Sequence, residues 1–170
     1  MDGISGLSAI FPRLTSIDRI AAATETWDAL AGESIILAGT DVDAVFFIID
    51  GELEVTIDTA DGSRTVGRVP TGGMVGEASL LAPGPATATV SAVTDATLIR
   101  LSRDAFAHLC ASDPAAASAL LGEIVSTLGA RLDAANTQLE ELVGPDGLRP
   151  IPGADDRLVG IHATLQGGAS

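Results

Sequence analysis

Apolar residues alternate with polar ones through much of residues 25–101, which is the period of a β-strand with one buried face. Leu53, Val55 and Ile57, for example, alternate with acidic residues and a threonine. Turns rich in glycine and aspartate separate the apolar segments. The pattern predicts strands at residues 25–30, 34–38, 44–50, 52–58, 64–69, 88–93 and 96–101. Seven or eight short strands at this spacing are typical of a sandwich, roll or barrel.

Helical patterns flank the strands. One covers residues 7–23, where the spacing of Thr15 and Asp18 predicts a capping box. A second, short helix is predicted after the last strand, with Ser102 as its cap and its end near Cys110.

A long helix is predicted from Pro114 to about Val143, with proline in the first helical position. Its apolar residues recur in alternating steps of four and three, which is the spacing of a heptad seam. At about 45 Å it is longer than a small domain is wide, so its far half needs a partner. We expect the first two turns to pack on the sheet and the seam to form a parallel homodimer; a helix folded back on its own domain is the alternative. The seam consists of Leu121, Val125, Leu128, Leu132, Ala135, Leu139 and Leu142.

The character of the chain changes again after Val143. Residues 144–170 contain six glycines and three prolines and only short apolar pieces, such as residues 158–161. This composition predicts a domain over residues 1–143 and a Gly/Pro-rich tail over residues 144–170. The tail is either solvated or docks on a partner through residues 158–161.

Composition narrows the classes of function. Hydrophobic residues make up 46% and charged residues 19%, as in globular proteins. The net charge is −14, and all 9 basic residues are arginines. Such an acidic surface repels nucleic acids and anionic membranes. No apolar run approaches the roughly 20 residues of a membrane span, and the amino terminus lacks signal-peptide features. We therefore expect a cytoplasmic protein that is not inserted in a membrane.

The stretch from Gly72 to Val90 has the layout of a phosphate cradle. Glycines let the backbone approach an anion, and a helical turn beginning near Gly76 would direct N–H groups toward it. Residues 72–90 contain no basic side chain. The pattern therefore predicts a binding site more clearly than it predicts a ligand.

No motif indicates catalysis. The chain has two histidines, His108 and His162, neither on a predicted strand, so a strand-built metal site lacks its ligands. We expect His108 to be a partly buried helix residue and Cys110 to be a small buried apolar residue. Neither cysteine nor serine occurs in a nucleophile motif. These residues predict a protein that is not an enzyme and holds no metal.

Several motifs in order resemble the cyclic nucleotide-binding domain of the catabolite activator (cyclic AMP receptor) superfamily. They are Gly32-Glu33, Gly39-Thr40-Asp41, residues 45–51, residues 75–81 and residues 85–90. The resemblance covers about residues 7–142. It implies a mainly β fold: an eight-stranded antiparallel β-roll, also called a double-stranded jelly roll, followed by a long dimerisation helix.

The resemblance also implies roles for individual residues. Glu77 would accept hydrogen bonds from a ribose hydroxyl, Thr87 and the Ala88 N–H would donate to the cyclic phosphate, and Asn136 would contact the base. The family's phosphate-binding arginine corresponds to Ala86. The implied ligand-binding set is Val75, Gly76, Glu77, Ala78, Ser79, Ala86, Thr87, Ala88 and Asn136.

Alanine at position 86 removes a charge-assisted hydrogen bond of about 1.5–3 kcal/mol, which weakens binding about tenfold to a hundredfold or more. Arg64 or Arg68 could serve instead. Two hypotheses follow: an adaptor module with no cofactor that binds a protein through its tail or sheet face, or a weak cyclic nucleotide sensor whose occupied pocket repositions the long helix. Glu77 fits both, because it would either cap the cradle's own N–H groups or bind ligand. Direct DNA binding is not expected, since Arg149 and Arg157 are the tail's only basic residues.

Overall fold

The computed structural model of the 170-residue chain describes residues 3–12, 14, 16–81 and 84–143, without the side chains of residues 3, 79, 81 and 138–143. It divides into two compact units, Met1–Ser126 and Thr127–Ser170. The boundary falls inside the last helix, α5 (Pro114–Val143). The predicted tail, residues 144–170, lies outside the described residues.

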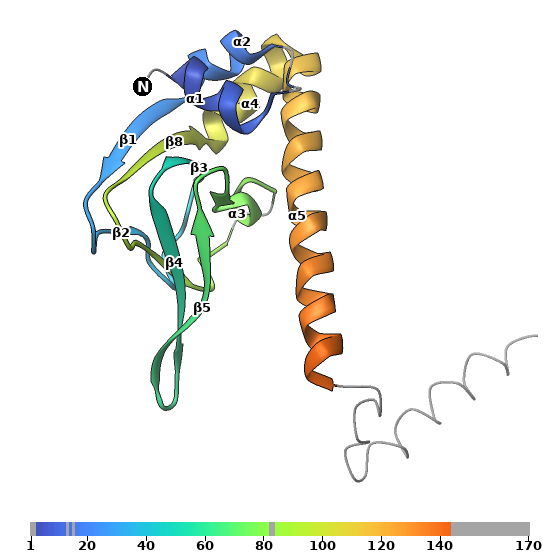
Figure 1. Cartoon of the computed structure of the whole chain (residues 1–170). Coiled ribbons are helices and arrows are strands. Elements are labelled where there is room, and N and C mark those ends of the chain that lie inside the picture. Colours follow the sequence, from blue (N-terminus) through green and yellow to red (C-terminus); the bar gives the residue numbers. More distant parts are fainter. Residues whose placement is uncertain (1–2, 13, 15, 82–83, 144–170) are drawn as a thin grey trace, which may run out of the picture. The chain divides into compact units, whose positions relative to one another are not determined.

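The first unit holds two four-stranded antiparallel sheets, as predicted for an eight-stranded β-roll (Figure 1). One has the order β1 (Glu25–Ala29), β8 (Ala96–Ser102), β3 (Ala44–Asp50), β6 (Met74–Val75). The other has the order β2 (Ser34–Ile36), β7 (Thr89–Ala92), β4 (Glu52–Thr59), β5 (Gly62–Pro70). Periodicity does not predict β6, because two residues are too few to show an alternation.

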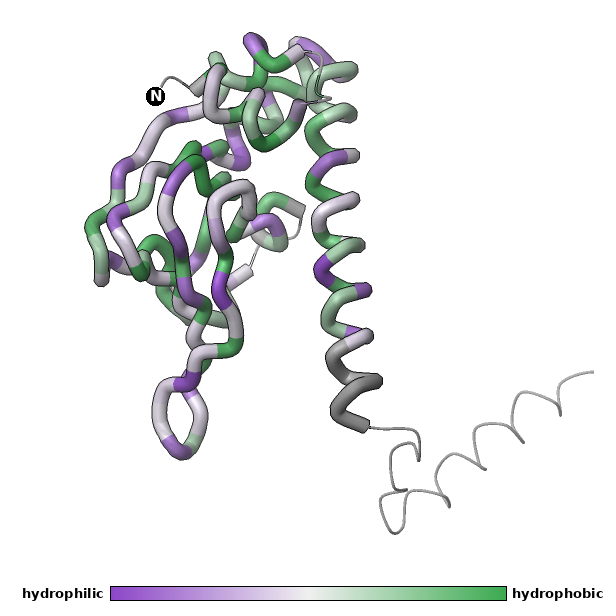
Figure 2. Tube along the Cα trace, in the orientation of Figure 1, coloured by the Kyte–Doolittle hydropathy of each residue, from purple (hydrophilic) through white to green (hydrophobic). Residues whose placement is uncertain are grey.

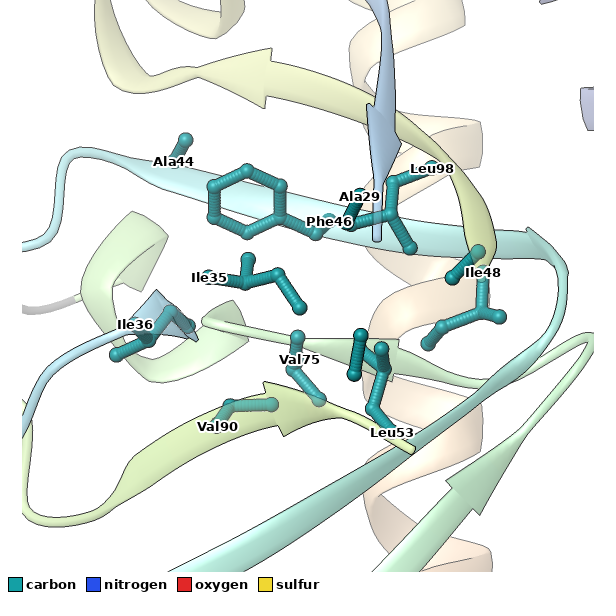
Figure 3. Packing of buried hydrophobic residues seen from close by; sticks show 12 residues of the cluster. Ala29, Ile35, Ile36, Ala44, Phe46, Ile48, Leu53, Val75, Val90 and Leu98 are labelled. Atoms are coloured by element: carbon teal, nitrogen blue, oxygen red, sulfur yellow. The ribbon is translucent and has the colours of Figure 1, made fainter. Parts of the chain in front are cut away.

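The two sheets face each other across a continuous apolar core. Phe46 and Leu98 from one sheet meet Leu53 and Val90 from the other (Figure 3). The far end of the β4–β5 hairpin is by contrast coloured mainly neutral to hydrophilic (Figure 2). The core is thus concentrated where the strands of both sheets overlap.

Strand β3 is buried on both faces, which explains its almost continuous apolar sequence. Phe46 lies edge-on to Trp27 with ring centroids 5.3 Å apart, on the side of the inter-sheet core. Phe47 lies edge-on to Phe11 at 5.4 Å, on the side covered by helices. This strand therefore joins the inter-sheet core to a second layer under the helices.

The helical layer consists of α1 (Gly3–Ile10), α2 (Ile17–Ala22), α4 (Arg103–Ser112) and the start of α5. The single helix predicted over residues 7–23 is wrong, because the structure has two helices there. Pro12 lies between them, and proline restricts the residue before it and supplies no N–H donor. The predicted capping box depends on Thr15 and therefore stays a prediction. Ser16 occupies the N-cap of α2 without a side-chain cap bond, and Thr15 lies outside the described residues.

The predicted cap of α4 is confirmed, and α5, which begins at Pro114 as predicted, is capped as well. Ser102 Oγ accepts a hydrogen bond of 3.1 Å from the Ala105 N–H at the start of α4. Asp113 Oδ1 accepts one of 3.0 Å from the Ala116 N–H at the start of α5. The sequence thus defines where both helices begin.

The core-facing stripe of α5 differs from the predicted seam. Its buried residues are Ala116, Ala117, Leu120 and Ile124, so the first turns of α5 are buried, as expected, but through residues other than those of the predicted seam. On the seam, Val125 is 54% and Leu132 62% exposed. Leu121 and Leu128 are half-buried and Ala135 is exposed, while the side chains of Leu139 and Leu142 lie outside the described part.

By length and composition alone, the span Pro114–Thr137 of α5 is apolar enough to cross a membrane, contrary to the expectation from the sequence. A core helix passes the same test, and 22% of this window is buried within the protein. Because Leu120 and Ile124 pack in the core of the first unit, the apolarity of this part has a structural explanation.

Candidate functional site

The cradle begins where β6 ends at Val75 and turns sharply through Gly76 into α3 (Glu77–Leu81). Gly76 has a φ of +80°, and a Cβ atom there would lie 2.5 Å from the Ala44 carbonyl oxygen. Only glycine combines this backbone conformation with so close an approach. The turn is thereby pressed against β3, on which α3 also packs.

The residues on either side of Gly76 differ in how far their side chains are exposed. Glu77 is the first residue of α3 and is half-buried, and Ala78 is exposed. The carboxylate of Glu77 at a helix start interacts favourably with the helix dipole. The Val75 side chain is 5% exposed and belongs to the inter-sheet core, so any contact of Val75 with a ligand would be through its backbone. The side chain of Ser79 lies outside the described residues.

The chain returns to β7 through a segment tied to the β2–β3 turn. The Ala86 N–H donates to the Thr40 carbonyl oxygen at 2.9 Å, and the Ala86 carbonyl oxygen accepts from the Gly39 N–H at 2.7 Å. Asp41 and Pro85 form an isolated antiparallel bridge. The Ala38 N–H donates to Thr89 Oγ1 at 3.0 Å. We call residues 38–41 and 85–89 with these bonds the strap.

The side chain of Ala86 is half-buried and packs against the inter-sheet core. Its methyl group supplies no positive charge. Thr87 is exposed and Ala88 half-buried, so both lie where solvent or a ligand can reach the segment. The segment consequently offers no cation at position 86, and the anion site predicted for the cradle stays a prediction.

Arg68 and Arg64, the two arginines that could replace the missing charge, both lie on β5. Arg68 Nη1 donates to Glu52 Oε2 at 3.1 Å on the neighbouring strand. Arg64 is exposed and lies opposite Ile57 in the β4–β5 register.

Residues 75–78 and 86–88, which lie apart in the sequence, both belong to the first unit. Asn136 belongs to the second unit and has an exposed side chain. Its predicted contact with a base stays a prediction. The sequence marks Gly39-Thr40 as a turn and a family motif, but it does not predict the hydrogen bonds of this turn to Ala86.

Two predictions about other chemistry-bearing residues are wrong. Cys110 and His108 on α4 are both exposed, where we expected a buried cysteine and a partly buried histidine. Within the part of the chain that the structure describes, no three His, Cys, Asp or Glu side chains are grouped to hold a metal ion.

The family model described as "Cyclic nucleotide-binding domain" matches residues 28–113. The chain therefore belongs to the cyclic nucleotide-binding domain family. The match includes the strap, the cradle, all of α4, and both sheets except for the first three residues of β1.

Individual relatives agree with this assignment. The chain is 26% identical over 156 residues to a CRP-like cAMP-activated global transcriptional regulator of Mycobacterium tuberculosis, covering 90% of this chain and 66% of the relative. It is 30% identical over 109 residues to a lysophospholipase of Aspergillus oryzae, covering 64% of this chain but 7% of that protein. A cyclic nucleotide-binding domain from Methylobacillus flagellatus has a similar fold, with a TM-score of 0.74, 22% identity, and coverage of 79% and 81% of the two chains.

Proposed function

We propose that this chain is a non-catalytic regulatory or adaptor module that keeps the family fold but binds cyclic nucleotides weakly or not at all. The observation that supports the proposal is position 86. There, an alanine methyl packs against the core where the family resemblance places a phosphate-binding arginine. The loss of such a charge-assisted bond costs about 1.5–3 kcal/mol, which is about tenfold or more in affinity.

The surrounding charges act in the same direction. The net charge of −14 repels an anionic ligand, and Arg68 is paired with Glu52. The strap meanwhile holds the segment around Ala86 by backbone bonds that need no ligand. A cradle built this way keeps its shape when empty, as an adaptor with a fixed surface requires.

We further propose that the module is a cytoplasmic homodimer formed along the α5 seam. Val125 and Leu132, seven positions apart on the seam, are exposed apolar residues that a second copy would cover. A protein partner would bind through the sheet face or through residues 144–170. Direct DNA contact is not part of the proposal, because the acidic charge disfavours phosphate binding.

Isothermal titration calorimetry tests the proposal directly. The full chain is titrated with cyclic AMP, cyclic GMP, cyclic CMP and cyclic UMP. We expect no heat of binding at ligand concentrations of about 100 μM, which corresponds to a free energy weaker than about −5.5 kcal/mol. Micromolar binding of any of the four would refute the adaptor proposal.

The second candidate is a genuine cyclic nucleotide sensor, which the intact Gly76 turn and the position of Glu77 at the start of α3 favour. The mycobacterial relative is named as cAMP-activated. In this alternative, ligand binding would shift the position of α5, which requires that the ligand prefers one arrangement over another. The same titration distinguishes the two candidates.

A further inference from the structure

A groove lies between α2 and α4 in the first unit and uses none of the residues of the cradle or the strap. Its volume is about 530 Å³, within the roughly 300–1,000 Å³ typical of small-molecule sites. It is widely open to solvent. It is lined by Asp18, Arg19, Ala22, Ala23, Ala105, His108, Leu109 and Ser112.

The charges of the groove do not cancel. Arg19 Nε lies 3.3 Å from Asp113 Oδ2, so a carboxylate of the protein already neutralises this guanidinium. For Asp18, in contrast, no ion pair is formed within the described residues. Among the described residues, the side chains of Asp18, Arg19 and Asp113 together carry one net negative charge, on a chain whose net charge of −14 already attracts cations.

The hydrogen-bonding groups also favour a donor ligand. The Ser112 hydroxyl donates its proton to the His108 carbonyl oxygen at 2.9 Å, which leaves the lone pairs of Ser112 Oγ as acceptors. The Asp18 carboxylate is a second acceptor. A primary ammonium group carries three donors and suits such a pair.

The floor of the groove is apolar. It consists of the methyl groups of Ala22, Ala23 and Ala105 with Leu109, which is 4% exposed. Small side chains on two facing helix surfaces leave room for an apolar ligand body. The groove therefore combines an acidic rim with an apolar floor.

We propose that this groove binds a small organic cation, namely a primary ammonium group on an apolar body of a few carbon atoms. The ammonium group lies at Asp18 and Ser112, and the apolar body lies on the alanines and Leu109. A carboxylate ligand of the same shape would meet the unpaired charge of Asp18, and a neutral one would lose the ionic contribution. This site is separate from the cradle and independent of the proposed function.

Hexylammonium is the probe for this proposal, with hexanoate and 1-hexanol as probes of the same chain length. Each is titrated into the ¹⁵N-labelled full chain at equal ionic strength, and amide shifts are followed by ¹H–¹⁵N correlation spectra. We expect saturable shifts at the amides of α2 and α4, with hexylammonium binding more tightly than hexanol and hexanoate binding least. Equal affinity for hexanoate and hexylammonium, or shifts spread over the whole chain, would overturn the proposal.

Two variants locate the site, each with a matched control. Asp18→Asn should weaken hexylammonium binding about fivefold, the upper range for an exposed ion pair. Asp58→Asn makes the same change in net charge at an exposed position of β4 and should weaken it less than about twofold. Ala22→Trp should abolish binding by filling the groove, whereas Ala111→Trp, at an exposed position of α4 that does not line the groove, should not.

Each comparison has an outcome that contradicts the proposal. An equal effect of the two aspartate variants would mean that only the overall field acts, and unchanged binding in Ala22→Trp would mean that the ligand lies elsewhere. Both results would overturn the site.

Discussion

Gly76 lies close to β3 and Gly72 does not, so a comparison of alanine substitutions at the two positions gives a quantitative prediction. Both residues have positive φ, +80° and +85°, so alanine at either position adopts a left-handed conformation, at a cost of about 1–2 kcal/mol. At Gly72 nothing lies within 4 Å of the added Cβ, so no other cost arises. At Gly76 the Cβ would lie 2.5 Å from the Ala44 carbonyl oxygen.

That oxygen belongs to the backbone of β3, where Ala44 pairs with Ser102 of β8, so it cannot move aside as a flexible side chain would. Displacement of packed backbone costs about 1–3 kcal/mol, as in overpacked cores. We therefore expect Gly72→Ala to lower the free energy of unfolding by about 1–2 kcal/mol, and Gly76→Ala to lower it by about 1–3 kcal/mol more.

Urea unfolding followed by the fluorescence of Trp27 measures both variants, because Trp27 is the chain's 1 tryptophan and contacts Phe46 in the inter-sheet core. The m-value should stay that of the parent, which shows that the midpoint shift reports stability. Equal losses in the two variants would refute the reasoning, since the close approach to Ala44 would then contribute nothing.

Three further predictions follow from the caps, the seam and the core. Asp113→Ala should lower the free energy of unfolding by about 0.5–2 kcal/mol, because the cap on the Ala116 N–H is lost. Arg19→Gln should lower it by less than about 0.5 kcal/mol, because the Arg19 side chain is 66% exposed. Urea unfolding midpoints compare the two variants. Leu132→Asp should convert a dimer to a monomer in size-exclusion chromatography with light scattering, because it places a charge in the proposed seam. Phe47→Ala should cost about 3–5 kcal/mol, since Phe47 is 0% exposed; thermal unfolding by circular dichroism measures the loss.

Each of these has a contradicting result. An Arg19→Gln loss as large as that of Asp113→Ala would mean that the ion pair, and not the cap, stabilises the start of α5. An unchanged oligomeric mass for Leu132→Asp would exclude the seam, with Thr137→Asp as the control for an added charge at an exposed position of the same helix. A Phe47→Ala loss below about 1 kcal/mol would contradict burial on both faces of β3.

The strands were predictable because burial of one face produces an alternation that needs no knowledge of the partner strand. This holds for β4, where Leu53 is buried and its neighbours are not. The alternation does not predict β6, because this strand has only two residues. Met74 and Val75 form a strand by pairing with Phe47 and Phe46 of β3. The break between α1 and α2 was missed because the apolar spacing continues through Pro12.

The two stripes of α5 show a different limit. Leu121 and Val125 fit a heptad seam, but the buried residues are one position earlier, Leu120 and Ile124. A helix with apolar residues on adjoining stripes cannot be oriented by periodicity alone, because both stripes satisfy the same spacing. Only the packing of the folded first unit shows that the stripe with Leu120 and Ile124 is the buried one.

The candidate site was predictable in outline and not in its contacts. The glycine before Glu77 and the alanine at position 86 can be found in the sequence by comparison with a family pattern. The strap consists largely of backbone hydrogen bonds between Ala86 and residues 39 and 40, and backbone bonds leave little trace in side-chain identity. The exposure of Cys110 and His108 was missed because the sequence does not say which side of α4 is covered.

The central claim is that alanine at position 86 keeps the cradle from binding a cyclic nucleotide strongly. The most direct test is the ratio of the dissociation constants for cyclic AMP and for adenosine, measured by calorimetry in the parent and in Ala86→Arg. Adenosine lacks the phosphate, so its binding reports the rest of the pocket. Unfolding midpoints confirm that the variant is folded.

The account predicts that Ala86→Arg tightens the binding of cyclic AMP by at least about tenfold and leaves adenosine unchanged. Micromolar binding of cyclic AMP by the parent, or a folded Ala86→Arg variant with no gain for cyclic AMP over adenosine, would contradict it.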